Sequence, residues 1–481
     1  MAKAGPNRPT QNWIDAGVRQ SPASPRHLFS APWEPVVVRR GDALGLRSLA
    51  DQFADAVAPD LNNRIQDGRW VTILAWCLAR SHEVFHACRG GSVVTRAQQR
   101  ERYAWLRPLE LMWVARTIAL TDDWSLRSLS GQRRVGPWYT QFAMAGDPFG
   151  MSDDQFRAYR QTGMYGGYRL AFRKWPGMTT SGDGWTPSKA TQQLAVWLDR
   201  RLGAARPSWP LHDTKGDDDR LPLRSAHRGR GAEWQWWLRR WRNFDRGGER
   251  AERHTLPRRR DDFEVLPEAD ILRPLLFHEG DRHGRRRLAV ARHVAGANTT
   301  DHLRLCESLA DGFSDDKTIA QLPHFSRLAD AGMSAMDLVA SSLRSAPKVK
   351  LSEAAAMPGA AAVCAELLDA AKAWRGRPAH PIRHAETADR LAEAISSARP
   401  VECLEALLRY HEIHGGGLRW FVVRDGMVEQ RTPSRGGASS YRFRLRSLCR
   451  LAVQCGTIES MPAIGEAGED PGDNAADDSD E

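Results

Sequence analysis

Apolar residues recur at helical spacing through the N-terminal part of the chain. Leu46, Leu49, Phe53 and Val57 follow one another at intervals of three and four, and the pattern stops at Pro59. Similar patterns predict helices at about 69–88, 97–121, 152–173 and 188–202, the last beginning after Thr186 and Pro187. These helices predict one helical domain.

We place this domain at about residues 31–205. The preceding residues, 1–30, are rich in Pro, Ser, Asn and Gln without apolar periodicity, so they are expected to be a flexible arm. Residues 206–265 interrupt the helical pattern with Pro, Gly and charge, and helical spacing returns over 266–460. The chain is therefore expected to contain two helical domains joined by a basic segment.

The second helical domain is predicted to end in a β-hairpin and a helix. Two short apolar runs flank Asp425-Gly426, a dipeptide that favours a two-residue hairpin turn. The last helix can turn apolar residues toward a core, namely Phe443, Leu445, Leu448, Leu451 and Ala452. The fold class is thus mainly α, a multidomain helical protein with a small C-terminal β-hairpin.

Charge is unevenly distributed along the chain. The formal net charge is +10, but residues 464–481 contain eight acidic residues and no basic one, so the rest of the chain carries +18. Residues 461–481 are therefore expected to be an acidic, disordered tail. A basic excess of this size favours a polyanion, and nucleic acid is the expected partner.

The sequence also indicates in which cellular compartment the protein is expected. The longest apolar stretches, 70–79 and 109–120, are shorter than the ~18 residues that span a bilayer, and no apolar run follows the N-terminal basic residues. The seven cysteines form no CxxC pair and are interpreted as reduced core residues. We expect a cytoplasmic protein without a membrane segment.

The basic segment contains an unusual run of tryptophan and arginine. Between Arg224 and Arg260 there are twelve Arg and four acidic residues. On a helix, Trp234, Trp237 and Trp241 would form a core stripe. Four residues lie off that stripe and could contact phosphates and stack on a base: Trp236, Arg239, Arg240 and Arg242. The alternative is a solvated arginine face that pairs with the acidic tail.

A second candidate site lies at residues 129–160. Gly136 supplies a permissive backbone before a helix that begins near Trp138, and amides at a helix start suit a phosphate. Asp153 and Asp154 follow Ser152 at the start of another helix. GMYGGYR (163–169) is interpreted as a helix-breaking turn with packed tyrosine rings.

At these residues the segment resembles the helix-hairpin-helix DNA glycosylases. VGPWYTQFA resembles the second half of the hairpin, GDPF the connecting turn and SDD the turn with the essential Asp. The resemblance implies that Asp154, or next to it Asp153, is the catalytic carboxylate. Trp138 stands where bifunctional members carry a lysine, which implies a monofunctional enzyme. Arg134 replaces the first hairpin glycine, and the turn-to-Asp spacing is slightly short.

This chemistry would require no metal and no cofactor. Cleavage of an N-glycosidic bond develops positive charge on the sugar, which a carboxylate stabilises, and the base must first be flipped out of the stack. The leading hypothesis is a DNA glycosylase for modified or foreign bases, as in defence against phage DNA. The rival is a non-enzymatic DNA-binding or scaffold protein with a winged-helix-like module at 167–198, in which Asp154 only caps a helix.

Histidine-containing segments suggest other sites. His411 and His414 stand three apart, but we interpret them as a capped helix end before Gly415. HEGDRHGRRRLAVARH (278–293) resembles a phosphate-facing surface more than a metal site, because arginines surround its histidines. Motifs for nucleotide hydrolysis, dinucleotide binding and serine hydrolases are absent from the sequence.

Overall fold

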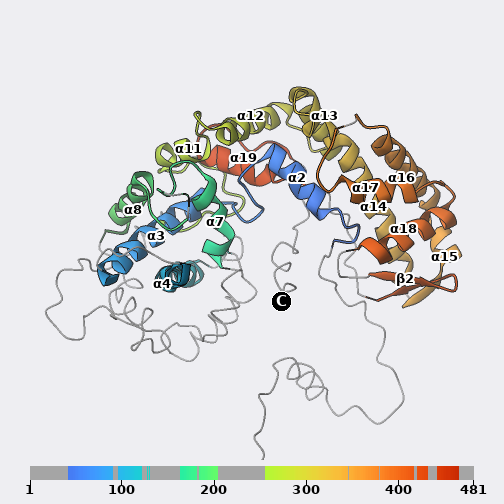
Figure 1. Ribbon diagram of the computed structural model, residues 1–481, viewed down its shortest axis with the longest axis horizontal. Coiled ribbons are helices and arrows are strands. Elements are labelled where there is room, and N and C mark those ends of the chain that lie inside the picture. The colour runs from blue at the N-terminus through green and yellow to red at the C-terminus, as the bar shows by residue number, and fades with distance from the viewer. Residues whose placement is uncertain are drawn as a thin grey trace, which may run out of the picture.

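A computed structural model describes residues 42–89, 96–121, 127, 129, 163–180, 182, 184–203, 255–344, 346–378, 380–415, 420–431 and 441–464. The described elements form an arch of helices with one small sheet near its end (Figure 1). The mainly α fold predicted from the sequence is confirmed. Among the described helices, none has the length and apolar content needed to cross a membrane.

The helices of the arch begin and end as follows. In chain order they are α2 (Arg47–Val57), α3 (Gly68–Arg89), α4 (Arg96–Leu120), α7 (Met164–Lys174), α8 (Lys189–Leu202), α11 (Ala269–Leu276), α12 (Arg282–Ala297), α13 (His302–Gly312), η5 (Ile319–Gln321), α14 (Leu322–Ser342), α15 (Leu351–Ala355), α16 (Ala360–Arg375), α17 (Ala385–Ala394), α18 (Pro400–His414) and α19 (Leu445–Gln454).

One arm of the arch contains α3, α4, α7 and α8 (Figure 1). Helix α3 packs between α4 and α8, and the rings of Trp76 and Trp113 meet edge to face with centroids 6.1 Å apart. Trp76 Nε1 donates to Asp199 Oδ1 of α8 at 2.8 Å. The predicted helices at 69–88, 97–121 and 188–202 are confirmed, with Ser188 as the side-chain cap of α8.

The described part of the predicted helix at 152–173 is confirmed by α7, whereas the interpretation of 163–169 as a helix-breaking turn is wrong. Helix α7 begins at Met164, directly after Gly163, and Tyr165 and Tyr168 are buried along one face with Phe172. Burial of this face outweighs the ~1 kcal/mol that a glycine costs inside a helix. The packing of the tyrosine rings is confirmed, since Tyr168 Oη accepts hydrogen bonds from the backbone N–H groups of Gln66 and Asp67.

The segment 167–198, considered as a winged-helix-like module, forms α7, a turn and α8. The turn is closed by one isolated bridge, between Thr179 and Pro187. The described residues of this segment contain no strand that would form a wing.

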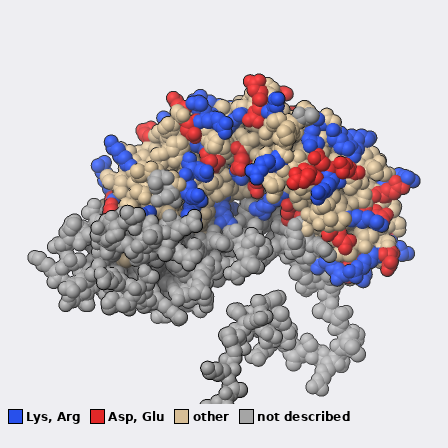
Figure 2. Space-filling view, viewed as in Figure 1, with Lys and Arg blue, Asp and Glu red and all other residues tan. Residues whose placement is uncertain are grey.

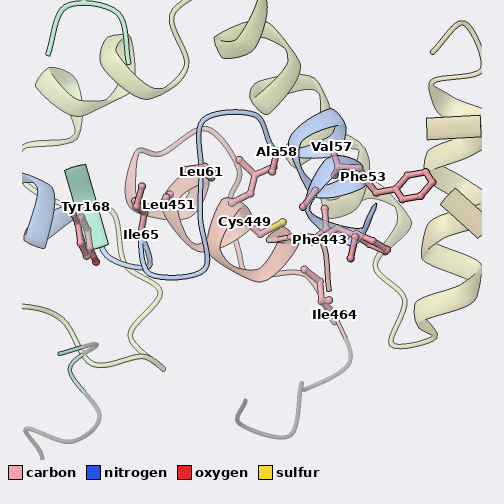
Figure 3. Close-up of a cluster of buried hydrophobic side chains, with 14 of the residues drawn as sticks. Phe53, Val57, Ala58, Leu61, Ile65, Tyr168, Phe443, Cys449, Leu451 and Ile464 are labelled. Atoms are coloured by element: carbon pink, nitrogen blue, oxygen red, sulfur yellow. The ribbon is translucent and has the colours of Figure 1, made fainter. Parts of the chain in front are cut away.

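The middle of the arch brings together distant parts of the sequence. Figure 3 shows side chains of α2 and the following loop in one buried cluster with residues of α19 and its flanks. Phe53 of α2 stacks on Phe325 of α14 with ring centroids 4.8 Å apart, and it meets Phe443 edge to face. Leu46, Leu49, Phe53 and Val57 are buried, as their spacing predicts. By its contacts, α2 belongs to the later helices of the chain.

A polar network joins this middle part to the first arm. The buried carboxylate of Asp67 accepts hydrogen bonds from the N–H groups of Arg69 and Arg258 and from Gln454 Nε2. Gln454 Oε1 accepts from the N–H of Gly68 at 2.7 Å. Because the buried Asp67 carboxylate and both polar atoms of the Gln454 side chain have partners, the network stabilises the junction between α3 and α19.

The other arm contains α14 to α18 and a three-stranded antiparallel sheet. Its strands are β1 (Lys348–Lys350), β2 (Phe421–Arg424) and β3 (Met427–Gln430), in the order β1-β3-β2. The predicted hairpin at Asp425-Gly426 is confirmed, with positive φ angles of 50° and 70° that suit a type I′ turn. Strand β1 was not predicted, because three residues give too short a pattern.

The interpretation of His411 as part of a helix end is confirmed. Helix α18 ends at His414, and the buried His411 ring bonds to backbone on both sides. Nδ1 lies 2.6 Å from the Ala43 carbonyl oxygen, and Nε2 accepts from the Trp420 N–H at 2.9 Å. Both ring nitrogens are therefore occupied, which leaves none for a metal ion.

Candidate phosphate-binding surface

The candidate residues chosen from the glycosylase-like and Trp/Arg-rich segments lie outside the described residues. These are Gly136, Trp138, Asp153, Asp154, Trp236, Arg239, Arg240 and Arg242. The third candidate segment, at 278–293, is described, and its residues 282–293 form the first three turns of α12.

Local sequence explains why α12 begins and ends where it does. The Asp281 carboxylate accepts from the Gly284 N–H at 2.8 Å and caps the first turn. Gly284 is required there, because a Cβ at this position would lie 2.4 Å from the carbonyl oxygen of His278. At the other end Asn298 takes a left-handed conformation with φ 39°, which is typical of a helix stop.

Arg287 anchors the inner side of α12. Its side chain is fully buried, and Nη1 donates to the carbonyl oxygen of Pro59 at 2.9 Å and lies 3.3 Å from Asp60 Oδ2. Its Nε donates to the carbonyl oxygen of Leu276 at 2.8 Å. Burial lowers the pKa of Arg287, while the carboxylates of Asp60 and Asp281 oppose this shift. Arg287 thus fixes α12 against the loop that follows α2.

His283 contributes to the same anchor from the rim. Its Nδ1 lies 2.6 Å from Asp60 Oδ2, and its side chain is 38% exposed. The shared carboxylate holds both His283 and Arg287, so it fixes the orientation of the imidazole at the N-terminal end of α12.

One flank of α12 packs against α13 and the residues that follow it. Arg286 pairs with Asp316 at 2.7 Å and lies over the ring of Phe313, 5.0 Å from its centroid. His293 Nε2 lies 2.9 Å from Ser308 Oγ. These contacts neutralise Arg286 and leave His293 facing a neighbouring helix.

The outer face of α12 carries three exposed arginines, Arg282, Arg285 and Arg292, which we call the arginine stripe. Their spacing of three and seven residues places them on one side of the helix, and α12 contains no acidic residue. Arg285 Nη1 donates to the carbonyl oxygen of Glu279 at 2.8 Å. Within the described ranges, no carboxylate forms an ion pair with any of the three. Their charges are therefore available to an anion.

The arginine stripe lies where a large partner can reach it. Helix α12 lies along the convex edge of the arch, with α19 packed beneath it (Figure 1). Figure 2 shows blue side chains on this edge, interspersed with red ones. Some other exposed arginines do have a carboxylate partner, for example Arg304 with Asp301 and Arg409 with Glu405.

This arrangement suits phosphate groups. Guanidinium groups bind phosphate oxygens through charge-assisted hydrogen bonds, and the partial positive charge of a helix N-terminus adds to the attraction near Arg282 and Arg285. Among the described residues, no cluster of His, Cys, Asp and Glu has the arrangement of a metal site. Of the histidines in this segment, His283 anchors α12 and His293 packs it against α13.

The sequence predicts one phosphate-facing surface over the whole basic run at 278–293, and the structure divides this run into buried and exposed positions. Arg287 falls on the apolar stripe of Val290, Ala291 and Val294, at positions i, i+3, i+4 and i+7, and is buried with them. That spacing was the signal, present in the sequence, that separates the anchor from the exposed arginines.

Three comparisons with known proteins were negative. No family model, curated protein or solved structure matches this chain.

Proposed function

We propose that this protein binds duplex DNA and that the arginine stripe of α12 contacts the phosphate backbone. The observation that carries the proposal is the stripe itself, three exposed arginines without a carboxylate partner among the described residues, on a helix without acidic residues. The formal charge of +18 on the chain before residue 464 supports it, because excess positive charge attracts polyanions.

The dimensions of the stripe fit this role. Ten residues separate Arg282 from Arg292, so about 15 Å of helix axis carries the three groups. Duplex DNA carries one phosphate per ~3.4 Å of axis on each strand, so flexible arginine side chains can reach separate phosphates over this length.

Salt-dependent binding tests the proposal. Changing Arg282, Arg285 and Arg292 together to Gln should weaken binding to a random-sequence duplex by at least ~10-fold and lower the salt slope by about 3. The matched control removes three exposed charges from the sheet, by changing Lys348, Lys350 and Arg424 to Gln. An equal loss in both variants would contradict a specific role for α12.

A narrower proposal is that the chain is a monofunctional DNA glycosylase with Asp154 as its catalytic carboxylate. It is supported by the resemblance of residues 129–160 to helix-hairpin-helix glycosylases, and by the ability of one carboxylate to stabilise a developing oxocarbenium ion. Action on modified or foreign DNA, as in antiviral defence, would follow. The alternative is a DNA-binding protein without catalysis.

The substitution Asp154→Asn distinguishes these two proposals. Asn retains most of the capping ability of Asp but removes the charge. A glycosylase should then bind DNA normally while base release falls by orders of magnitude, and Asp153→Asn should have a smaller effect. Base release is measured with genomic DNA from several sources. Wild-type release by the variant, or none by the unaltered protein, favours the binding protein without catalysis.

A further inference from the structure

We propose that the acidic end of the chain, residues 466–481, binds in cis along the arginine stripe of α12 and competes there with DNA. The contact between tail and helix is independent of the proposed function, whereas the competition rests on it. The occupant of this surface in the free protein is thus a segment of the same chain.

The chain leaves the described fold at the C-terminal end of α12. The Ala463 N–H donates to Oδ1 of Asn298 at 2.7 Å, and Asn298 is the residue that caps this end of the helix. Ile464 is 8% exposed and lies at the edge of the buried cluster around Phe443 and Cys449 (Figure 3). These contacts fix the origin of the acidic tail beside α12.

The tail is long enough to follow the whole stripe. The axis of α12 is about 24 Å long over its sixteen residues. The seventeen residues from 465 to 481 span up to ~56 Å when extended, and a flexible chain of this length has a root-mean-square span of ~20–25 Å. Attachment at one end therefore gives the tail a local concentration in the millimolar range at the stripe.

Charge and direction both favour this pairing. The tail contributes eight carboxylates without a basic residue. From Asn298 it would meet Arg292 first and then Arg285 and Arg282. It would thereby run toward the N-terminal end of α12, where the helix dipole also attracts negative charge.

A peptide experiment tests the contact without DNA. A chain that ends after Gly465 keeps every described residue, and a fluorescein-labelled peptide of residues 466–481 serves as the probe. Fluorescence anisotropy at 50 mM salt should detect binding, and Gln at Arg282, Arg285 and Arg292 should weaken it at least tenfold. Changing Lys348, Lys350 and Arg424 to Gln should change the affinity for the peptide less than twofold. Equal losses in the two variants, or no binding to the unaltered chain, would overturn the proposal.

The full-length protein supplies the test in cis. With Arg285→Lys, a zero-length carbodiimide cross-link should join residue 285 to a tail carboxylate, and mass spectrometry identifies the joined peptides. Loss of the peptide's affinity on changing Arg239, Arg240 and Arg242, with no loss in the α12 variant, would place the tail on the other basic segment and refute the inference.

Measurements of DNA affinity distinguish a failure of this inference from a failure of the proposed function. Removing residues 466–481 should raise duplex affinity about tenfold at 50 mM salt, with a smaller gain at 200 mM, and the gain should vanish in the α12 variant. Peptide binding without DNA binding would refute the proposed function and the competition, but it would leave the tail contact standing. DNA binding through the stripe without peptide binding would refute only the tail contact.

Discussion

Arg69 and Glu268 form a fully buried, two-pronged ion pair between α3 and the residue that precedes α11. Arg69 Nε lies 2.5 Å from Glu268 Oε1, and Nη2 donates to Oε2 at 2.9 Å. Thr72 donates to the same carboxylate at 3.1 Å. The pair joins one arm of the arch to its middle across a long stretch of sequence.

Breaking one side of this pair should be costly. Glu268→Gln removes the negative charge that faces the buried Arg69 guanidinium in this pair, so the free energy of unfolding should fall by about 3–5 kcal/mol. Urea denaturation followed by circular dichroism measures the change. The double variant Arg69→Met and Glu268→Leu should lose less, because it removes both charges of the pair from the interior. Equal losses in the single and double variants would show that the ion pair is not the cause.

Stability should decrease in mild acid because of His302. Burial, and then the charge of Arg442, lower the pKa of His302 to about 4 from the ordinary 6.5. Below pH 6.5 the unfolded chain binds a proton that the folded protein does not, so stability falls until about pH 4, by about 3 kcal/mol in all. The free energy of unfolding should therefore change less between pH 7 and pH 4.5 in the His302→Gln variant than in the unaltered protein. His278→Gln, at an exposed position, should leave the difference unchanged.

Replacing either of two glycines in open surroundings by alanine should have opposite effects on the stability of the protein. A Cβ at Gly426 or at Gly296 would meet nothing within 4 Å, but Gly426 has a φ of 70° and Gly296 lies within α12. Gly426→Ala should destabilise the protein by about 1 kcal/mol, because L-residues disfavour that conformation. Gly296→Ala should stabilise it by about 0.5–1 kcal/mol through helix propensity. Thermal denaturation of both variants measures these effects, and shifts of the same sign would contradict the assigned backbone conformations.

The described cysteines should resist modification in the native protein. Cys77, Cys306, Cys364, Cys403, Cys449 and Cys455 are buried and free. Burial also raises the pKa of Cys306, Cys449 and Cys455, which keeps them as unreactive thiols. Ellman's reagent should label these six only after unfolding, when all seven thiols of the chain react. Rapid labelling of several thiols under native conditions would contradict this packing.

The local pattern of the sequence determined the identity of the main elements. Apolar spacing predicted α2, α3, α4 and α8, and the Asp-Gly pair predicted the hairpin between β2 and β3. Phe443, Leu445 and Leu448 are buried as predicted, although α19 begins at Leu445 after two residues with positive φ. Such features depend on backbone preferences and on side chains a few residues apart, so the sequence alone contains them.

Tertiary packing decided which elements meet. The spacing in α2 predicted its apolar face, but not that Phe53 would stack on Phe325 of α14. The turn expected at 163–169 became part of α7, because Tyr165 and Tyr168 gain more by packing than the glycines cost. Both outcomes depend on partners distant in sequence.

The same division holds within three consecutive arginines of α12. Each residue of a helix is rotated by about 100° from the one before it, so the sequence determined that Arg285, Arg286 and Arg287 face different directions. Only the folded chain decided their roles: Arg285 is exposed, Arg286 pairs with Asp316 and Arg287 is buried against Pro59. The reason is that burial depends on which distant segment covers each face of the helix, and local spacing does not encode that segment.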